Sequence, residues 1–204
     1  YSPWLESRIM RFIITLIILF SMLLSSQIIS HTQTYENGNI KSIYYHQKIG
    51  DQIKKVKCEE FFENGHKYRQ GSFKNDKKSG IWIEWNKDGK KISEGNYTNG
   101  KRDGFWVGWY GNGVQQGEVT WINGKENGLW VIWHKNGKKM REVNWVNGKR
   151  DGKCLEWYDN GVKKLEGYWK DGFKDGKWKY WYDTGKSVKE EIHENGKMKI
   201  EKWH

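Results

Sequence analysis

Histidine and cysteine are the residues of this chain whose chemistry most often builds a metal or catalytic centre, and their spacing argues against one. The 204 residues include two Cys and six His, which are His31, His46, His66, His134, His193 and His204. No two His have the spacing of a metal-binding pair, and no Ser or Cys lies in a nucleophile motif. The glycines punctuate short extended runs and do not open a helix, so they form no phosphate-binding loop. We therefore expect no cofactor, no metal and no enzymatic activity.

Glutamate is the acid/base candidate, because it recurs at a fixed interval. Its copies are Glu94, Glu118, Glu142, Glu166 and Glu190, each 24 residues after the last. Acid/base catalysis needs two carboxyls whose environments push their pKa values apart, and equivalent positions in a repeat do not provide that. The recurrence favours a structural role, in which these carboxylates pair with turn residues such as Lys101, Lys125 and Lys149, or with Arg102 and Arg150.

The 24-residue interval also governs glycine and tryptophan. It relates Gly80, Gly104, Gly128, Gly152 and Gly176 to one another, and likewise Gly89, Gly113, Gly137, Gly161 and Gly185. Self-similarity of this kind predicts one structural unit copied in tandem, in which each copy buries its apolar surface against its neighbours.

One copy contains the pattern of a β-hairpin. Cys154–Tyr158 and Lys163–Trp169 alternate as strands do, and Asp159-Asn160-Gly161 between them suits a type I turn closed by a left-handed glycine. The segment Lys170–Gly176 then reverses the chain into the next copy. The sequence therefore predicts an all-β fold of 24-residue hairpins, stacked into one elongated, twisted, open antiparallel sheet with a single layer.

If Tyr158 pairs with Val162, strand alternation places two sets of aromatic residues on opposite faces. We expect one face to be the packed spine, formed by Trp85, Trp109, Trp133, Trp157, Trp181, Tyr97, Trp121, Trp145 and Trp169. The other face is the candidate binding surface, formed by Trp82, Trp106, Trp130, Trp178, Glu94, Glu118, Glu142, Glu166 and Glu190. The alternative is that the tryptophans of the second set pack against each other or against a terminal segment.

The N-terminal region indicates export. Residues 1–9 form a leader outside any pattern, and translation is expected to begin at Met10. Residues 10–30 resemble a signal peptide, because the apolar run Phe12–Leu24 is too short for an ordinary membrane span. We expect cleavage near Ser26 or Ser30, with an uncleaved membrane anchor as the alternative. Residues 31–57 form a divergent segment with one possible extra hairpin, and residues 58–204 form the array with degenerate terminal copies.

The cysteines and the net charge add two expectations. Cys58 and Cys154 are four periods apart, which separates them by nearly 40 Å at about 4.8 Å per strand, so two free thiols are predicted. Without Glu6, Arg8 and Arg11 the net charge is +10. This charge favours anionic partners at long range, although lysines in turns also keep a long sheet soluble.

The copies resemble MORN repeats. The similarity lies in Leu165-Glu166-Gly167-Tyr168-Trp169 and in Asn99-Gly100-Lys101-Arg102-Asp103-Gly104, whose pattern Asn147–Gly152 repeats. It covers roughly residues 58–200. The Gly-x-Trp-x-x-Trp-Tyr-x-Asn-Gly rhythm is similar to the bacterial variant that is labelled a YwqK-type antitoxin. That label implies an intracellular toxin as partner, which conflicts with a signal peptide, so only the fold is carried over.

These patterns favour a non-enzymatic scaffold that binds another protein at the bacterial envelope, in the periplasm or outside the cell. The alternative is binding of anionic lipid headgroups or cell-wall glycan through the basic turns and the aromatic columns. An antitoxin-like or enzymatic role is the weakest of the hypotheses. Export argues against nucleic acid as a partner, and the oligomeric state is left open.

Overall fold

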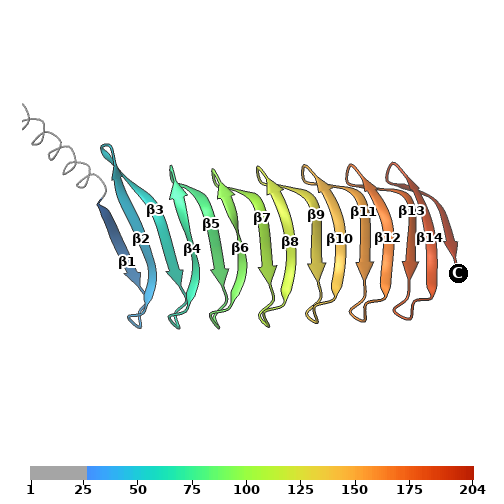
Figure 1. Ribbon diagram of the computed structural model, residues 1–204, viewed down its shortest axis with the longest axis horizontal. Coiled ribbons are helices and arrows are strands. Elements are labelled where there is room, and N and C mark those ends of the chain that lie inside the picture. Colours follow the sequence, from blue (N-terminus) through green and yellow to red (C-terminus); the bar gives the residue numbers. More distant parts are fainter. Residues whose placement is uncertain (1–26) are drawn as a thin grey trace, which may run out of the picture.

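The computed structural model describes residues 27–204, and these fold into one sheet of 15 strands. The strands are β1 (Ile28–Thr34), β2 (Ile40–Ile49), β3 (Gln52–Phe61), β4 (Lys67–Lys74), β5 (Lys77–Trp85), β6 (Lys91–Thr98), β7 (Lys101–Trp109), β8 (Gln115–Ile122), β9 (Lys125–Trp133), β10 (Lys139–Val146), β11 (Lys149–Trp157), β12 (Lys163–Lys170), β13 (Phe173–Trp181), β14 (Ser187–Glu194) and β15 (Lys197–Trp203). Each strand pairs with its sequence neighbours in antiparallel fashion (Figure 1). The predicted all-β, open antiparallel sheet is confirmed.

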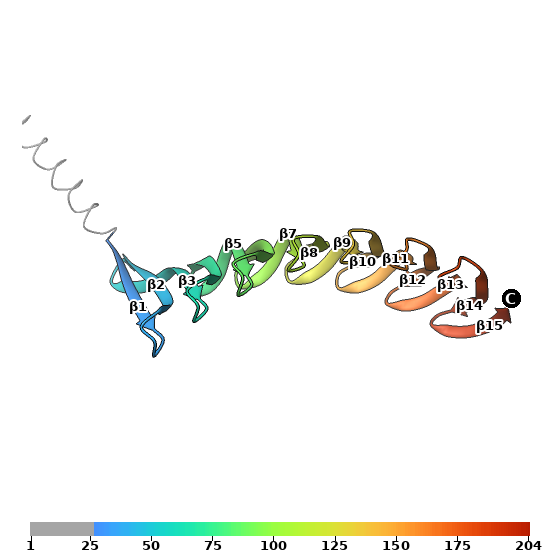
Figure 2. The same cartoon turned by 90° about the horizontal axis from the view of Figure 1, so that it is seen from below.

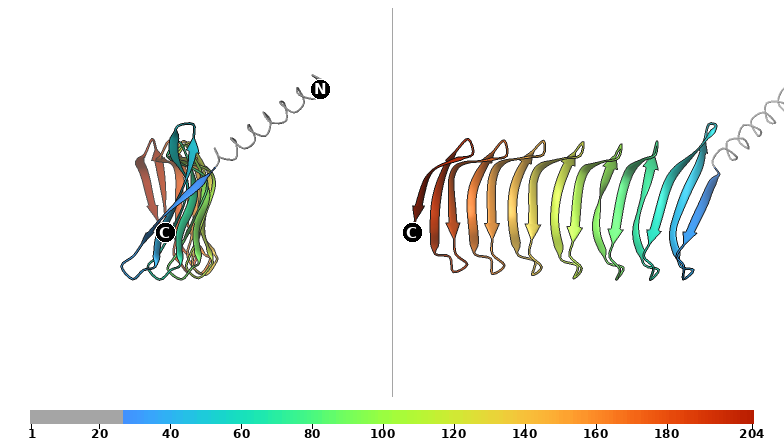
Figure 3. Two further views of the ribbon diagram at one scale, coloured as in Figure 1. Left: turned by 90° about the vertical axis from the view of Figure 1, so that its left-hand side faces the viewer. Right: turned by 180° about the vertical axis from the view of Figure 1, so that it is seen from behind.

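The molecule is an elongated ribbon one sheet thick. The strands lie across its long axis, and no second layer covers either face of the described part (Figure 2). Seen along the ribbon, the strands at the two ends are rotated relative to those in the middle (Figure 3), as the right-handed twist of strands requires. Within residues 27–204 no helix is long and apolar enough to cross a membrane. The expected leader and most of the expected signal peptide lie outside the described residues.

The loops at one edge of the ribbon have the predicted geometry. The Tyr158 amide donates to the Val162 carbonyl at 2.9 Å, and the Gly161 amide donates to the Tyr158 carbonyl at 2.9 Å. Gly161 has a φ of 93°, which an L side chain adopts only under strain. The same pair of bonds closes the loop between β1 and β2, where Tyr35 and Asn39 take these roles around Glu36-Asn37-Gly38. Residues 28–61 thus continue the hairpin sheet toward the N-terminus.

The turns at the other edge are tighter than predicted. The chain reverses over two residues, Asp171-Gly172, which both have positive φ (51° and 90°), and β13 resumes at Phe173. A pair of positive φ values defines the type I′ turn, whose twist matches that of the flanking strands. The expectation that the whole of Lys170–Gly176 forms the link was therefore wrong.

An irregularity beside each three-residue loop changes which residues share a face. In the copy used for the prediction, Trp157 pairs with Lys163 but Glu156 pairs with Leu165, so Lys164 is an extra residue in the strand. This β-bulge shifts the alternation by one position. As a result Cys154 pairs with Gly167, and Leu155 pairs with Glu166.

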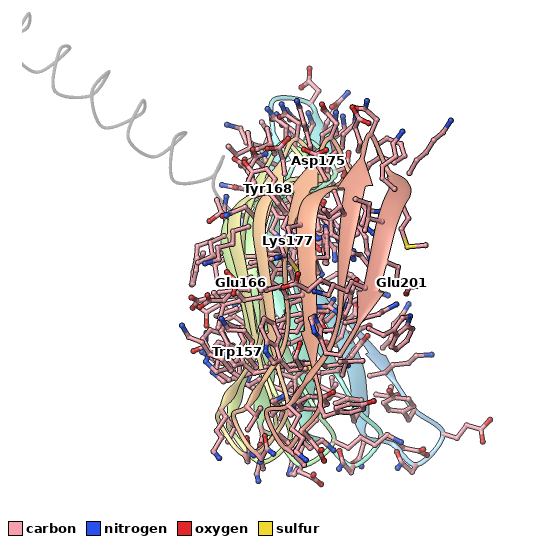
Figure 4. The ribbon with its side chains drawn as sticks, turned by 90° about the vertical axis from the view of Figure 1, so that its right-hand side faces the viewer. Trp157, Glu166, Tyr168, Asp175, Lys177 and Glu201 are labelled. Carbon is pink, nitrogen blue, oxygen red and sulfur yellow. The ribbon has the colours of Figure 1, made fainter. Side chains whose placement is uncertain are left out.

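The two faces of the ribbon are defined by this register. We call one the packed face, whose central row runs through Cys58, Gly71, Trp82, Gly95, Trp106, Val119, Trp130, Val143, Cys154, Gly167, Trp178 and Glu191. We call the other the charged face, which carries Trp85, Trp109, Trp133, Trp157 and Trp181 beside Glu94, Glu118, Glu142, Glu166 and Glu190. Viewed from the C-terminal end, Trp157, Glu166 and Tyr168 lie on one side of the sheet and Glu201 on the other (Figure 4).

Side chains at the loops connect each copy to the next. The Asn136 Nδ2 donates to the Asp159 carbonyl at 2.7 Å, and the Asn160 Nδ2 donates to the Asp183 carbonyl at 2.8 Å. The Tyr158 hydroxyl donates to the Trp181 carbonyl at 2.9 Å. These bonds span 23 residues, so the loops hold neighbouring hairpins together beyond the strand ladder.

Candidate interaction surfaces

The tryptophans of the predicted binding surface form the core of the packed face. Trp82 is 2 % exposed and Trp178 is 1 % exposed, and Trp106 is also buried, while Trp130 is half-buried. The indole of Trp106 covers Gly95 so closely that a Cβ added there would lie 2.1 Å from its ring. Tryptophans therefore alternate with small residues across the strands, and the alternative that they serve packing is the one the structure shows.

The predicted division of residues between the faces was wrong for the same reason. Tyr97, Trp121, Trp145 and Trp169, which were assigned to the spine beside Trp85, lie on the packed face next to the buried row. Trp85 and its equivalents share the charged face with Glu94 and its equivalents. The sequence assignment assumed an unbroken alternation through each strand, and the bulge beside every loop breaks it.

A column of cations on the packed face was missed by the sequence prediction. Lys78 Nζ lies 4.0 Å from the ring centre of Trp82, the Arg102 guanidinium lies 4.2 Å from that of Trp106, and Lys174 Nζ lies 4.7 Å from that of Trp178. Arg150 occupies the same column and lies over Trp145 and Trp169. These residues also recur every 24 positions, and Glu126 is the exception. This 24-residue period was the sequence signal that could have identified these cations as partners of the aromatic residues.

The charged face carries a lattice of ion pairs. Lys91 pairs with Glu94 at 2.6 Å and Lys163 with Glu166 at 2.7 Å, while Lys139 pairs with Glu142. For Glu94, Glu142 and Glu166 the partner is thus the lysine that follows the three-residue loop, whereas Glu118 accepts from Gln115 and Glu190 pairs with Lys177 and Lys179. These partners correct the expectation of Lys101, Lys125, Lys149, Arg102 or Arg150. Each of the first three pairs bridges the bulge, because the extra residue brings positions three apart onto one face. The hydrogen bond from Lys163 holds the pKa of Glu166 below its ordinary value.

An apolar row lies exposed in the middle of the charged face. Ile81, Phe105 and Leu129 are 53, 57 and 48 % exposed and occupy equivalent positions in three successive copies, with Asn96 and Thr120 between them on the intervening strands. In the next two copies this position is Lys153 and Lys177. The row therefore ends abruptly toward the C-terminus, and it is a property of particular copies and not of the repeat itself.

A groove of about 420 Å³ lies on the packed face over β5 to β9. Its lining includes Glu84, Arg102, Gly108, Gly117 and Trp130. The groove exists because these copies have Gly108 and Gly117 at positions where most other copies carry a longer side chain.

The last copy replaces aromatic packing with a buried polar cluster. Glu191 occupies the position of Gly167, and its carboxylate accepts hydrogen bonds from Tyr180 at 2.8 Å and from Lys174 at 3.1 Å. It is also paired with Lys189 at 2.7 Å and lies 2.8 Å from His193 Nε2. Burial alone would raise the pKa of Glu191, but these hydrogen bonds outweigh it and hold the pKa well below the usual range.

Both cysteines are free and buried in the central row of the packed face, on β3 and β11. Eight strand spacings of about 4.8 Å separate these two strands, which places the thiols far outside bonding distance. Burial is the main cause that raises the pKa of both thiols. Within residues 27–204 no cluster of three or more His, Cys, Asp or Glu residues could hold a metal ion.

The hairpin array and its two aromatic faces define a β-hairpin repeat protein. The MORN repeat model matches residues 94–105 and 144–163, and the MORN repeat variant model matches residues 56–75, 78–99, 126–147 and 174–195. Together these segments cover more than half of the chain, and the chain belongs to the MORN repeat family.

No curated protein matches the sequence. Among solved structures, the chain is similar to a crystal structure of a protein with unknown function from Bacteroides fragilis NCTC 9343. The two are 8 % identical, the match covers 90 % of this chain and 96 % of that one, and the TM-score is 0.19.

Proposed function

We propose that this protein is an exported, non-enzymatic scaffold that binds another protein through the middle of its charged face. The observation that carries the proposal is the exposed row of Ile81, Phe105 and Leu129. Large apolar side chains that are exposed together in a soluble repeat protein are typical of a binding surface.

The surroundings of this row have the composition of an interface. Ile83 and Val107 extend the apolar area along their strands, and the Lys91–Glu94 ion pair borders it. An apolar centre with a polar rim is the usual arrangement where two proteins meet. The array also presents this surface as a rigid, continuous strip, because each strand is bonded to both neighbours.

Export is part of the proposal and rests on the sequence. The apolar run Phe12–Leu24 has the length of a signal-peptide core. The position of β1 supports Ser26 over Ser30 as the cleavage point. Ile28 and Ile29 already pair with Gln47 and His46, and cleavage at Ser30 would remove these pairs.

Site-specific photocrosslinking in native cells tests the binding surface. A photoreactive phenylalanine analogue at position 105 is expected to give one discrete crosslinked protein, and Leu129→Asp in the same chain is expected to reduce its yield at least tenfold. Phe173 provides the matched control, because it is an equally exposed aromatic residue outside the row. Crosslinking of the same species from both positions, or a yield unaffected by Leu129→Asp, would contradict the proposal.

A further inference from the structure

The groove on the packed face is a built feature of two neighbouring strands. Positions 84, 108, 132, 156 and 180 are equivalent, and four of them carry Glu, Ile, Glu and Tyr, whereas the second is Gly108. Gly108 pairs directly with Gly117, whose equivalents include Arg141 and Leu165. These two glycines face each other across neighbouring strands, so the exposed backbone forms the floor of the groove. A volume of about 420 Å³ lies within the range of small-molecule sites.

Trp130 forms one wall of this groove because its own copy departs from the pattern. Trp82, Trp106 and Trp178 lie flat over glycines and donate their indole Nε1 to the carbonyls of residues 72, 96 and 168. Trp130 faces Val119 instead, whose side chain prevents that position. Its Nε1 lies 3.6 Å from where a Cβ of Gly117 would be. Among residues 27–204 it makes no hydrogen bond to a carbonyl like those of Trp82, Trp106 and Trp178. An indole N–H is therefore left at the edge of the groove.

The groove also holds one carboxylate and one guanidinium that lack ion-pair partners among residues 27–204. Glu60 and Glu156, which are equivalent to Glu84, pair with Arg69 and Arg141. Glu84 lies between Arg69 on β4, whose guanidinium pairs with Glu60, and Ser93 on β6. Arg102 is stacked over Trp106 and Trp121. The two charges cancel, so the groove attracts neither a polyanion nor a polycation as a whole.

These features determine the class of ligand. A hydrocarbon would bury both charges without compensation, which is strongly unfavourable. A pyranose ring presents an apolar face of C–H groups and a rim of hydroxyls, which can donate to Glu84 and accept from Arg102, Gln116 and the Trp130 N–H. We propose that the groove binds a neutral oligosaccharide, with one sugar ring stacked against Trp130. This site lies on the face opposite to the proposed protein-binding row, so the ribbon would hold a glycan and a protein at once.

Calorimetric titration of the purified chain with chitohexaose, cellohexaose and maltohexaose tests the proposal. At least one of these neutral oligosaccharides is expected to bind, with quenching of tryptophan fluorescence. Gly108→Ile is expected to weaken binding at least tenfold, because it fills the floor with the side chain that Ile132 provides in the next copy. A Cβ at Gly108 meets no atom closer than 3.6 Å, so the fold should tolerate the change and the Tm should be unaffected.

Two further variants separate this proposal from alternatives. Glu84→Gln removes the charge but keeps the shape, and is expected to weaken binding three- to tenfold. Phe105→Asp alters the opposite face, and should leave oligosaccharide binding unchanged even where protein crosslinking is lost. The proposal is overturned by equal affinity of Gly108→Ile and the unaltered protein. It is also overturned if only polygalacturonate or anionic phosphatidylglycerol vesicles bind, with loss at high salt, or if none of the three oligosaccharides binds.

Discussion

At the scale of single residues, the stability of the packed face depends on the contact between an indole and a bare backbone. Gly95 and Trp106 illustrate it: the ring occupies the space that any side chain at position 95 would need. The recurrence of both residue types is visible in the sequence. Their contact is not, because it requires the register that the bulge sets.

Gly95→Ala is expected to destabilise the protein by more than about 2 kcal/mol, since a buried indole and rigid backbone must both move. Urea unfolding followed by tryptophan fluorescence measures this change. Gly108→Ala is the matched control, because its added methyl group meets only ordinary contacts. Equal effects of the two substitutions would show that the low β-strand propensity of glycine, and not the indole contact, decides the change in stability.

Glu191 gives the C-terminal end a dependence on pH. Its pKa is lower in the folded protein than in the unfolded chain, so its contribution to stability is present above a pH of about 4.3 and is lost as the pH falls below that value. We expect Glu191→Gln to lower the free energy of unfolding by about 2 kcal/mol or more at pH 7, because four donors lose a charged acceptor.

The difference between Glu191→Gln and the unaltered protein should shrink as the pH is lowered from 7 to 3, as measured by urea unfolding at each pH. The remaining carboxylates are common to both proteins and cancel in this comparison. A difference that stays constant over this range would mean that Glu191 does not act through its charge.

At the scale of the hairpin, the loop and the strands of each copy were predictable from the sequence, whereas the bulge was not. The loop Asp159-Asn160-Gly161 has a turn-specific sequence, and the left-handed conformation of its glycine was predicted correctly. The strands follow from alternation. The bulge at Lys164 has no residue signature of its own, because it arises where the twist of the strands meets the three-residue loop. The division of tryptophans between faces failed for this reason alone.

The copy with Cys154 provides a test of how the hairpins pack. Its cross-strand partner is Val143, whereas three of the four tryptophans at the equivalent position face Gly71, Gly95 and Gly167. Cys154→Trp alone should destabilise the protein by about 1–3 kcal/mol through overpacking. Combined with Val143→Gly, it should recreate the indole-on-glycine contact and recover at least about 1 kcal/mol of that loss.

A double-mutant cycle by chemical unfolding measures this coupling. Additive effects of Cys154→Trp and Val143→Gly would contradict the packing model. Val119→Gly is a useful companion variant, since it should let Trp130 lie flat as Trp106 does.

At the scale of the whole molecule, the ribbon is a one-dimensional stack in which each copy contacts only its neighbours. The period alone made this architecture predictable. The exposed row at Phe105 and the groove at Gly108 were not predictable from the period. Both features depend on positions where the copies differ, and finding them also requires knowing which face of the sheet each residue lies on.

Deletion of residues 126–149 removes one complete period, and the remaining strands keep their faces. We expect this protein to fold with the same β-sheet circular dichroism spectrum and a Tm that is lower by several degrees. Deletion of residues 126–148 is the control, because a slip of one residue exchanges the faces of the following strand. Equal folding of the two shortened chains would contradict the register described above.

The order of the strands also determines how the molecule responds to tension. The two ends of the described chain lie at opposite ends of the ribbon, and the ladder hydrogen bonds run parallel to its long axis (Figure 1). A pull between the two ends of the ribbon therefore peels strands away in sequence, since it never shears several of them together. Such a ribbon would extend gradually under modest force and re-form when released, as an elastic tether does.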